Sequence, residues 1–484
     1  MKNSGMRTFL SLAILFLCFG KAIGQKYIPT IEQGPAMIKY DPKLIVKSGY
    51  LVVPEDRKSI ASRKIKIPFV FFRKPGSAEK KGVTLFSTGG PGYSTIANID
   101  SIGYDSGLLK YGGFIVFDQR GTKRSSTCLD CPEIDTAIKI SYKRNLPQKT
   151  LVLEAVKKCR EKLLAQGINL SAYNTIESAK DINDLRLALQ LDSLNLVGIS
   201  YSGGLMLTVA RNHPEGVRAL ILNSPLPAYV NYEEHALFNI NEALNQVFEN
   251  CLADSSGNEV YKDLKSRFQQ YFTSITGKKF SIAYLEKGTK DSLKINYGKS
   301  ELLDVIINHL NTSQVKSVPF IMNELIKGKH HDYVREVMDG YFSGDDKLSR
   351  GMRYSVYCTE QIAYSNEKLI QEQELIMPWL SGYVFNNVDH EICNCWKVTP
   401  EPAAAKLPLY SSIPVLMSAG DIDPWCRPFY NQLIKRYMPN SQLLVFHNRG
   451  HLSGFGFQGT DFLQLFMEYP YRKIVSPSNQ VKVE

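Results

Sequence analysis

The stretch from residue 194 to residue 204 constrains the fold most, because it passes from a strand pattern to a helix pattern within a few residues. The apolar run Leu194–Val197 predicts a short buried strand, and helical spacing begins at Gly203. Ser200 lies at the bend between the two. A serine on such a sharp turn stands clear of the sheet, where a base and backbone N–H groups can reach it. The pattern predicts a nucleophile elbow with Ser200 as the nucleophile.

The residues around Ser200 match most of the pattern that such a turn requires. In the usual Gly-x-Ser-x-Gly sequence, small residues flank the serine; Gly198 and Ser200 fit, and Ser202 takes the place of the second glycine. A turn centred on Ser202 is the alternative. It would lack the leading glycine and would begin too late after the strand, so we prefer Ser200.

Apolar runs and helical segments alternate along the chain. Two alternating stretches, 47–53 and 64–72, predict an opening hairpin. Six later runs are typical of buried parallel strands: 83–86, 114–117, 194–197, 219–222, 415–417 and 443–446. Stretches with helical spacing separate several of these runs: 150–166, 175–189 and 203–213. This alternation predicts an α/β fold with a mostly parallel central sheet.

The strand pattern stops over residues 231–400, where apolar residues recur at spacings of three and four and helices are expected. One hairpin is also expected in this region, with 280–285 against 292–297. We predict that 231–400 is an inserted, mainly helical cap. It would separate a first core segment, 25–230, from a C-terminal core segment, 401–484.

Residues 1–24 resemble a secretory signal peptide, with basic residues first, an apolar run from Thr8 to Gly20, and small residues before Gln25. The apolar run is too short to span a bilayer comfortably, so we expect no stable membrane anchor. The segment predicts export to the periplasm or the extracellular space.

The charge of the chain argues against nucleic-acid binding. Removal of Lys2, Arg7 and Lys21 with the signal segment lowers the formal net charge from +11 to +8. No dense run of lysine and arginine remains, and no basic stripe is interleaved with aromatic residues. We therefore expect no nucleic-acid partner.

Eight cysteines remain after the signal segment, and export makes disulfides plausible. Cys128 and Cys131 have a spacing found in metal and redox sites, and Cys393 and Cys395 are closer still. Neither pair has a second His/Cys cluster beside it. We therefore expect no metal and no other cofactor, and the cysteine spacing alone leaves the pairing open.

A serine nucleophile needs a histidine base and an acid that orients it, in the chain order Ser, Asp, His for this kind of sheet. We prefer His451 as the base, because it follows a glycine beyond a predicted strand, whereas His447 lies at the strand boundary. Among the acids we prefer Asp423, because Pro424 fixes its loop and it lies further from the strand than Asp421. Asp421 remains the alternative.

Attack by the serine creates an oxyanion that requires two N–H donors. One is expected from Tyr201, the residue after the nucleophile. The other is expected from the glycine-rich segment 88–92, which follows an early strand; we favour Gly90, with Gly89 as the alternative.

Taken together, these motifs resemble the proline iminopeptidase family of α/β-hydrolases, and in particular its tripeptidyl aminopeptidase-like branch. The resemblance runs from about residue 48 to residue 466, and the motifs that carry it are Gly89-Gly90-Pro91-Gly92, Asp118-Gln119-Arg120-Gly121-Thr122-Lys123-Arg124-Ser125, Gly198-Ile199-Ser200-Tyr201, Gly420 to Pro424, and Gly450-His451. Thr88, Lys123 and Ser202 depart from the family pattern. The resemblance implies an α/β-hydrolase fold whose C-terminal core segment is TAP-like.

The resemblance also implies an activity, that of an exported serine aminopeptidase. Such an enzyme releases single residues, including proline, or short peptides from free peptide N-termini through a Ser-His-Asp acyl-enzyme mechanism. The cap should hold a carboxylate for the substrate ammonium, whose pKa is about 8. Glu360 resembles the acidic cap position of the family, and Glu233 and Glu234 are alternatives.

In this branch the segments around Cys131 and Cys159 often carry paired cysteines, as do those around Cys358 and Cys395, and we expect these two disulfides. An exported carboxylesterase with the same triad is the alternative function. A non-catalytic binding protein would require a broken triad, which the sequence does not show. The expected partner is a peptide substrate, and the sequence makes no prediction of oligomeric state.

Overall fold

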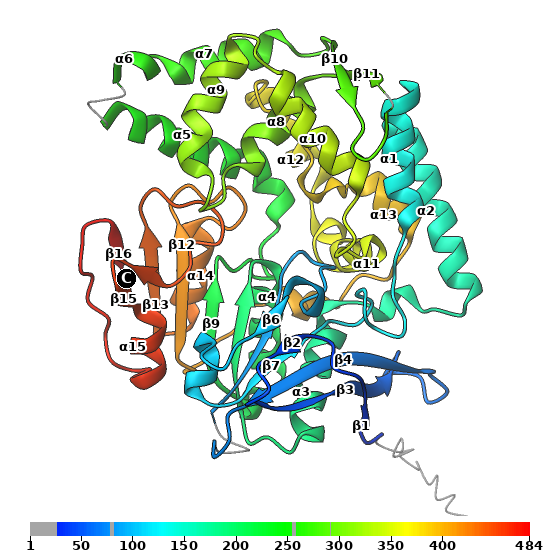
Figure 1. Cartoon of the computed structure of the whole chain (residues 1–484), viewed down its shortest axis with the longest axis vertical. Coiled ribbons are helices and arrows are strands. Elements are labelled where there is room, and N and C mark those ends of the chain that lie inside the picture. The colour runs from blue at the N-terminus through cyan, green and yellow to red at the C-terminus, as the bar shows by residue number, and fades with distance from the viewer. Residues whose placement is uncertain (1–26, 78–81, 254–257, 291) are drawn as a thin grey trace, which may run out of the picture.

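The computed structural model describes residues 27–77, 82–253, 258–290 and 292–484. The predicted signal peptide, 1–24, lies outside the described residues. A large twisted sheet occupies one half of the molecule, and a layer of helices lies over one end of it (Figure 1). Among the described residues, no helix is both long and apolar enough to cross a membrane.

The central sheet has ten strands in the order β1-β3-β4-β7-β5-β8-β9-β12-β13-β16. Neighbours from β7 to β13 are parallel, and the strands outside this block pair antiparallel. The strands of this sheet are β1 (Thr30–Gln33), β3 (Ile45–Pro54), β4 (Lys64–Arg73), β5 (Val83–Ser87), β7 (Phe114–Phe117), β8 (Leu194–Ile199), β9 (Val217–Asn223), β12 (Val415–Gly420), β13 (Ser441–Phe446) and β16 (Val481–Val483). This order confirms the predicted α/β fold and its mostly parallel sheet.

All eight predicted core strands are present, and the opening hairpin is β3 against β4. Three small sheets accompany the large one: β2 (Lys39–Tyr40) with β6 (Ser101–Ile102), β10 (Phe280–Leu285) with β11 (Ser292–Tyr297), and β14 (Gly456–Phe457) with β15 (Thr460–Asp461). The pair β10–β11 is the hairpin expected within the cap. Its strands pair from Phe280 against Tyr297 to Leu285 against Ser292.

Helices cover both faces of the sheet. On one face lie α3 (Thr175–Ala188), α4 (Tyr201–Asn212) and α14 (Pro428–Tyr437), whose apolar residues share one core with the strands. On the other face, α15 (Phe462–Glu468) packs Phe462 and Phe466 against β9, β12 and β13. Successive strand residues point to opposite faces of the sheet, and helices bury both faces. The central strands are therefore almost wholly apolar.

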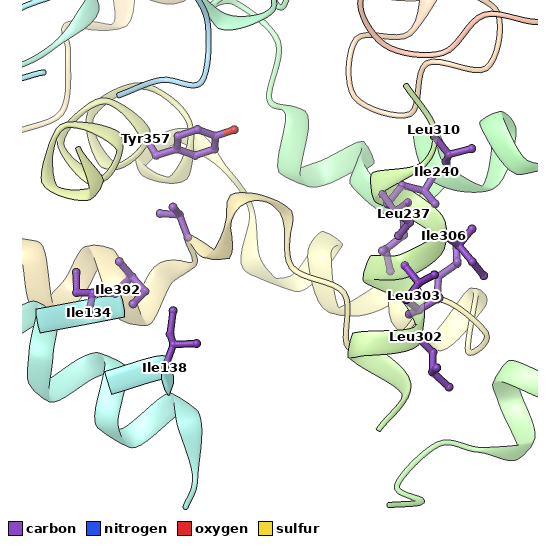
Figure 2. Packing of buried hydrophobic residues seen from close by; sticks show 14 of the residues in the cluster. Ile134, Ile138, Leu237, Ile240, Leu302, Leu303, Ile306, Leu310, Tyr357 and Ile392 are labelled. Atoms are coloured by element: carbon purple, nitrogen blue, oxygen red, sulfur yellow. The ribbon is translucent and has the colours of Figure 1, made fainter. Parts of the chain in front are cut away.

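The cap is mainly helical, as predicted. Its helices are α5 (Ala236–Ala253), α6 (Asn258–Tyr261), α7 (Leu264–Ser274), α8 (Lys299–Asn308), α9 (Val318–Ile326), α10 (His331–Ser343), α11 (Arg350–Glu360), α12 (Glu367–Ile376) and α13 (His390–Trp396). Two helices from the first core segment, α1 (Pro132–Arg144) and α2 (Gln148–Ala165), share the same apolar core. Figure 2 shows Ile134 and Ile138 of α1 near Ile392 of α13. The helical layer therefore extends beyond 231–400, and the domain boundaries stay a prediction.

Two disulfides hold this layer together. Cys131 pairs with Cys159, as predicted, and joins the start of α1 to α2. The second prediction was wrong in one residue, because Cys358 of α11 pairs with Cys393 and not with Cys395. Cys393 and Cys395 both lie on α13. Residues two apart in a helix point about 200° away from each other around the axis, so only one of these two cysteines can face α11.

We predict that replacing Cys131 and Cys159 together by serine lowers the free energy of unfolding by about 2–4 kcal/mol, because the bond closes a loop of roughly 30 residues in the unfolded chain. Denaturant unfolding of the variant and the parent protein measures the difference. Replacing Cys395 by serine is the control and should change the free energy of unfolding little, since Cys395 is not disulfide-bonded.

Candidate active site

Ser200 lies where β8 ends and α4 begins. Its backbone adopts φ 56° and ψ −124°, a strained conformation for a residue with a side chain, and its N–H donates to the Asn223 carbonyl on β9. The turn leaves no room for a side chain at Gly198, where a Cβ atom would lie 2.6 Å from the Ser202 carbonyl oxygen. The structure therefore has the strand–turn–helix geometry of a nucleophile elbow.

The two serines of the elbow have different surroundings. Ser202 is fully buried; its hydroxyl donates to the Ser87 carbonyl at 2.7 Å and accepts the Ile199 N–H at 2.7 Å. Ser200 is only partly buried and lines a cavity of about 460 Å³. A substrate can therefore reach the Ser200 hydroxyl, whereas the Ser202 hydroxyl ties α4 to the sheet.

The candidate acid and base lie together at the carboxyl ends of neighbouring strands. Asp423 follows β12 and His451 follows β13, and His451 Nδ1 lies 2.8 Å from Asp423 Oδ2. The other carboxylate oxygen, Oδ1, accepts the N–H groups of Trp425 and Cys426 at 2.9 Å and 2.8 Å. Asp423 is completely buried. The carboxylate is thus held in place and can fix the orientation of the imidazole.

The charge state of Asp423 follows from these partners. Burial acts to raise the pKa of this carboxyl, but the adjacent His451 and the two backbone N–H donors outweigh it and lower the pKa below its ordinary value. The group is therefore an anion at neutral pH, which is the state that can stabilise an imidazolium.

The alternative residues form a second pair of their own. His447 Nδ1 lies 2.6 Å from Asp421 Oδ2, and His447 is absent from the cavity that contains Ser200. Burial raises the pKa of Asp421, although the contact with His447 acts to lower it. Both His–Asp pairs join the loop after β12 to the loop after β13, and of their histidines only His451 lines the cavity.

His451 is positioned from both the core and the cap. Its backbone N–H donates to the Leu310 carbonyl, and its own carbonyl accepts the N–H of Thr312, so the segment after α8 holds it on one side. The Trp425 ring meets the imidazole edge-on, with 5.1 Å between ring centroids. These contacts leave the base little freedom to rotate away.

The Ser200 hydroxyl lies within hydrogen-bonding distance of the Cys426 thiol, with 3.8 Å between Oγ and Sγ. Ser200 and His451 line the same cavity, and among the contacts of the described residues no hydrogen bond joins them. Contacts of this kind often tighten only when substrate binds.

The glycine-rich segment after β5 lies against the elbow. A Cβ atom on Gly89 would be 3.0 Å from Ser200 Cβ and 3.4 Å from the Tyr201 nitrogen. Gly89 and Gly90 both line the cavity, and Gly90 has φ 121°. Tyr201 is the first residue of α4, so its N–H has no partner within the helix. These N–H groups can converge on an oxyanion, and both glycines remain candidates for the second donor.

Several residues that sequence reasoning missed hold this glycine-rich segment. Gln119 Nε2 donates to the Thr88 carbonyl, Asn386 Nδ2 to the Gly90 carbonyl, and Arg353 Nε to the Pro91 carbonyl. Gln119 belongs to a motif that the sequence analysis singled out only by resemblance. Asn386 and Arg353 come from the cap, and nothing in their local sequence marks them.

Glu360 and its alternatives do not line the cavity. Glu360 is buried and accepts a hydrogen bond from Thr175, Glu234 accepts the N–H of Asn366, and Glu233 borders a neighbouring cavity. The acidic residue that does line the cavity is Asp304 on α8. Its Oδ2 accepts a hydrogen bond of 2.5 Å from the Tyr341 hydroxyl. Sequence reasoning missed Asp304 because one aspartate on an amphipathic helix carries no signal.

One group among the described residues could place three metal ligands near each other: Asp423, Cys426 and His451, whose ligand atoms lie within 4.8 Å. Asp423 already accepts three hydrogen bonds, from His451 and from two N–H groups. The arrangement is therefore better suited to orienting an imidazole than to chelating an ion.

Comparison with known families agrees with this geometry. Residues 106–292 match the family described as alpha/beta hydrolase fold, and residues 380–457 match the family described as TAP-like protein. The chain has an α/β-hydrolase fold, and its C-terminal part is similar to the TAP-like family. The predicted resemblance and the prediction of an enzyme of the hydrolase class are confirmed at this level.

Two curated proteins similar to this α/β-hydrolase are the tripeptidyl aminopeptidases of Streptomyces lividans and Streptomyces coelicolor. Each is 27% identical over 191 residues, which are 37% of this chain and 35% of the relative. The similarity thus spans about a third of the length of these curated relatives. Their activity enters here only as a proposal.

Solved structures similar to this α/β-hydrolase include a proline iminopeptidase from Mycobacterium smegmatis, with 12% identity, coverage of 87% of this chain and 97% of that one, and a TM-score of 0.38. An alpha/beta hydrolase from a deep-sea metagenome has 13% identity, coverage of 86% and 98%, and a TM-score of 0.38. Such low scores carry no argument about function.

Proposed function

We propose that the protein is an exported serine aminopeptidase that releases single residues, including proline, or short peptides from free peptide N-termini. The observation that carries the proposal is the cavity itself. Ser200 on a strained elbow, the glycines of the oxyanion segment and one acidic cap residue, Asp304, all line it, and so does His451, which contacts the buried Asp423.

In the proposed mechanism, His451 takes the proton from Ser200 Oγ as the serine attacks the substrate carbonyl. The negative charge that develops on the carbonyl oxygen is stabilised by the N–H groups of Tyr201 and Gly90. Asp423 keeps the proton of His451 on Nδ1 and stabilises the imidazolium. His451 then protonates the leaving amine, and water attacks the acyl-enzyme with His451 again as the base.

The amino terminus of the substrate requires a carboxylate, because an ammonium group buried without a partner is costly. Glu360 was the sequence-based candidate for this role. We propose Asp304 instead, since it lines the cavity and comes from the cap. A carboxylate that lines the same cavity as the nucleophile would favour substrates with a free amine close to the scissile bond.

The test of the proposed function is a panel of chromogenic mono-, di- and tripeptides, each with a free and an acetylated amino terminus, assayed beside Ser200→Ala. Cleavage confined to free amines and lost in the variant supports an aminopeptidase. Which of the mono-, di- and tripeptide substrates is cleaved gives the number of residues released per cut. Turnover of acyl esters that depends on Ser200, without peptide cleavage, would assign a carboxylesterase. A chain inert to both would be a binding protein.

We predict that Asp304→Asn raises KM for free-amine peptides by about 10- to 100-fold, because an ion pair is replaced by a neutral contact. KM for the acetylated peptides should stay unchanged. Glu360→Gln is the matched variant: if it removes the preference for free amines and Asp304→Asn does not, the amine is bound at Glu360.

The same carboxylate predicts a pH dependence. Burial raises the pKa of Asp304 to about 7, so the group loses its charge as the pH falls through that value. The substrate amine, with a pKa of about 8, gains charge over the same interval and offsets part of this loss, so KM for free-amine peptides should rise between pH 8 and pH 6 by roughly fivefold. KM for acetylated peptides should not follow this rise, and a parallel rise for both substrates would contradict the assignment.

Export is supported by the signal-peptide pattern of residues 1–24 and by the two disulfides, which form and persist outside the reducing cytosol. We propose a periplasmic or extracellular enzyme whose partner is a peptide substrate. Mass spectrometry of the protein recovered from the host's culture medium or periplasm, with its N-terminus read directly, tests both the export and the cleavage point.

A further inference from the structure

Three buried hydroxyl and carboxyl groups connect the elbow to the cap. The Thr175 hydroxyl donates to Glu360 Oε2 at 2.5 Å and lies 2.8 Å from the Tyr201 hydroxyl. Because a threonine hydroxyl has one hydrogen, the Tyr201 hydroxyl must donate to Thr175 when Glu360 is ionised. The resulting chain runs from Tyr201 at the start of α4, through Thr175 at the start of α3, to Glu360 at the end of α11.

The first member of the chain adjoins the nucleophile. Tyr201 follows Ser200 directly, and its N–H is the proposed oxyanion donor. The residue is only 4% exposed. Because a tyrosine side chain has two rotatable bonds and a rigid ring, a hydrogen bond at the far end of the ring restrains the backbone from which the ring extends. The position of the N–H thus depends on a contact made well behind the cavity.

The last member of the chain lies where the cap joins the core. Lys406 Nζ donates to the carbonyl oxygens of both Glu360 and Val230, the residue just before the cap begins. At the other end of the cap, the Glu401 N–H donates to the Thr359 carbonyl, and Glu401 Oε1 accepts the N–H of Ile176. Hydrogen bonds therefore join both ends of the cap to residues close to Glu360, whose carboxyl group accepts the hydrogen bond from Thr175.

The charged groups that face Glu360 from these elements are Glu401, Lys406 and Arg211. Burial raises the pKa of Glu360 to about 8, and the nearby Glu401 acts in the same direction, whereas Thr175, Lys406 and Arg211 act to lower it. Burial likewise raises the pKa of Glu401 and lowers that of Lys406. The cluster holds two acidic and two basic side chains, so replacing one of them changes its charge balance, whereas Thr175 and Tyr201 are neutral and can be changed without disturbing it.

We propose that Glu360 is a positioning residue for the nucleophile elbow: through Thr175 it fixes the Tyr201 side chain, and with it the Tyr201 N–H that faces the oxyanion. The inference rests on the proposed function of the elbow and assigns Glu360 a role that needs no contact with substrate. In this proposal the cap does more than line the cavity, because Glu360 on its helix α11 also restrains the nucleophile elbow.

The experiment compares variants of the full-length mature protein by kcat per active site, with active sites counted by reaction with a fluorophosphonate. Tyr201→Phe removes one hydroxyl and keeps the backbone N–H, and Thr175→Val breaks the middle of the chain. Both should lower kcat per titrated site by roughly three- to thirtyfold and leave KM nearly unchanged, because the N–H acts on the transition state. Thr175→Ser restores the hydroxyl and should restore kcat.

Thr208→Val is the matched control. Thr208 is also buried on α4, and among the described residues its hydroxyl donates to the Gly204 carbonyl within the same helix and to no other group. The control should lower neither kcat per site nor KM. The proposal is overturned if Tyr201→Phe and Thr175→Val reduce only the number of titratable sites, or if Thr208→Val lowers kcat per site equally. A parent protein that does not react with the fluorophosphonate overturns the proposed function together with this inference.

Discussion

Replacing Ser200 by alanine is expected to lower kcat for peptide hydrolysis by roughly 10⁴- to 10⁶-fold, because the acyl-enzyme can no longer form. The fold should be unaffected, since the Ser200 side chain faces the cavity and its described hydrogen-bonding neighbour is the Cys426 thiol at 3.8 Å. Steady-state kinetics gives the loss of activity, and thermal unfolding gives the stability. Labelling by a fluorophosphonate should disappear with the activity.

Ser202→Ala provides the control two residues away. The Ser202 hydroxyl lies between the Ser87 carbonyl and the Ile199 N–H, so its removal leaves buried groups unpaired and should cost about 1–3 kcal/mol of stability. The folded fraction should still react with the fluorophosphonate. One serine would then affect chemistry and the other stability. A variant at Ser202 that folds but does not react, beside a reactive variant at Ser200, would move the nucleophile to Ser202.

Most of the core could be predicted from the sequence because its strands are buried on both faces. A strand such as β7, Phe114–Phe117, is wholly apolar, and a run of this kind between helical stretches is typical of a buried parallel strand. The opening hairpin was predictable for a different reason, since period-two alternation is visible in 47–53 and 64–72. The positions of α1 and α2 could not be predicted, because an amphipathic helix shows that it has a partner without showing which one.

The residues of the candidate site that follow core strands could be predicted from the sequence, whereas those on cap helices could not. Ser200, Asp423 and His451 follow predicted strands, and the carboxyl ends of parallel strands meet at one edge of a sheet, so chain order and loop position suffice to bring them together. Asp304 and Glu360 come from cap helices, whose orientation over the sheet depends on packing. The sequence therefore does not mark Asp304, and Glu360 was expected at the cavity although it lies behind the elbow. The choice of Cys393 over Cys395 likewise depends on which side of α13 faces α11.

The second large effect concerns Asp423, which we propose orients His451 as the base. Asp423→Asn should lower kcat by about 10⁴-fold, because an asparagine amide can donate to His451 Nδ1 and so favours the tautomer whose Nε2 cannot accept the proton of Ser200. The substitution keeps the size of the side chain. Activity should recover partly at high pH, where hydroxide can replace the missing general base, and this separates an incorrect tautomer from misfolding.

Asp421→Asn is the matched control, because Asp421 and His447 form a second His–Asp pair between the same two loops, with 2.6 Å between Oδ2 and Nδ1. His447 does not line the cavity, so breaking this pair should lower kcat by less than about tenfold and should act mainly on stability. If instead Asp421→Asn removes the activity and Asp423→Asn retains it, the base is oriented by the other pair. The contrast bears on the assignment because, of the two histidines, only His451 lines the cavity that contains Ser200.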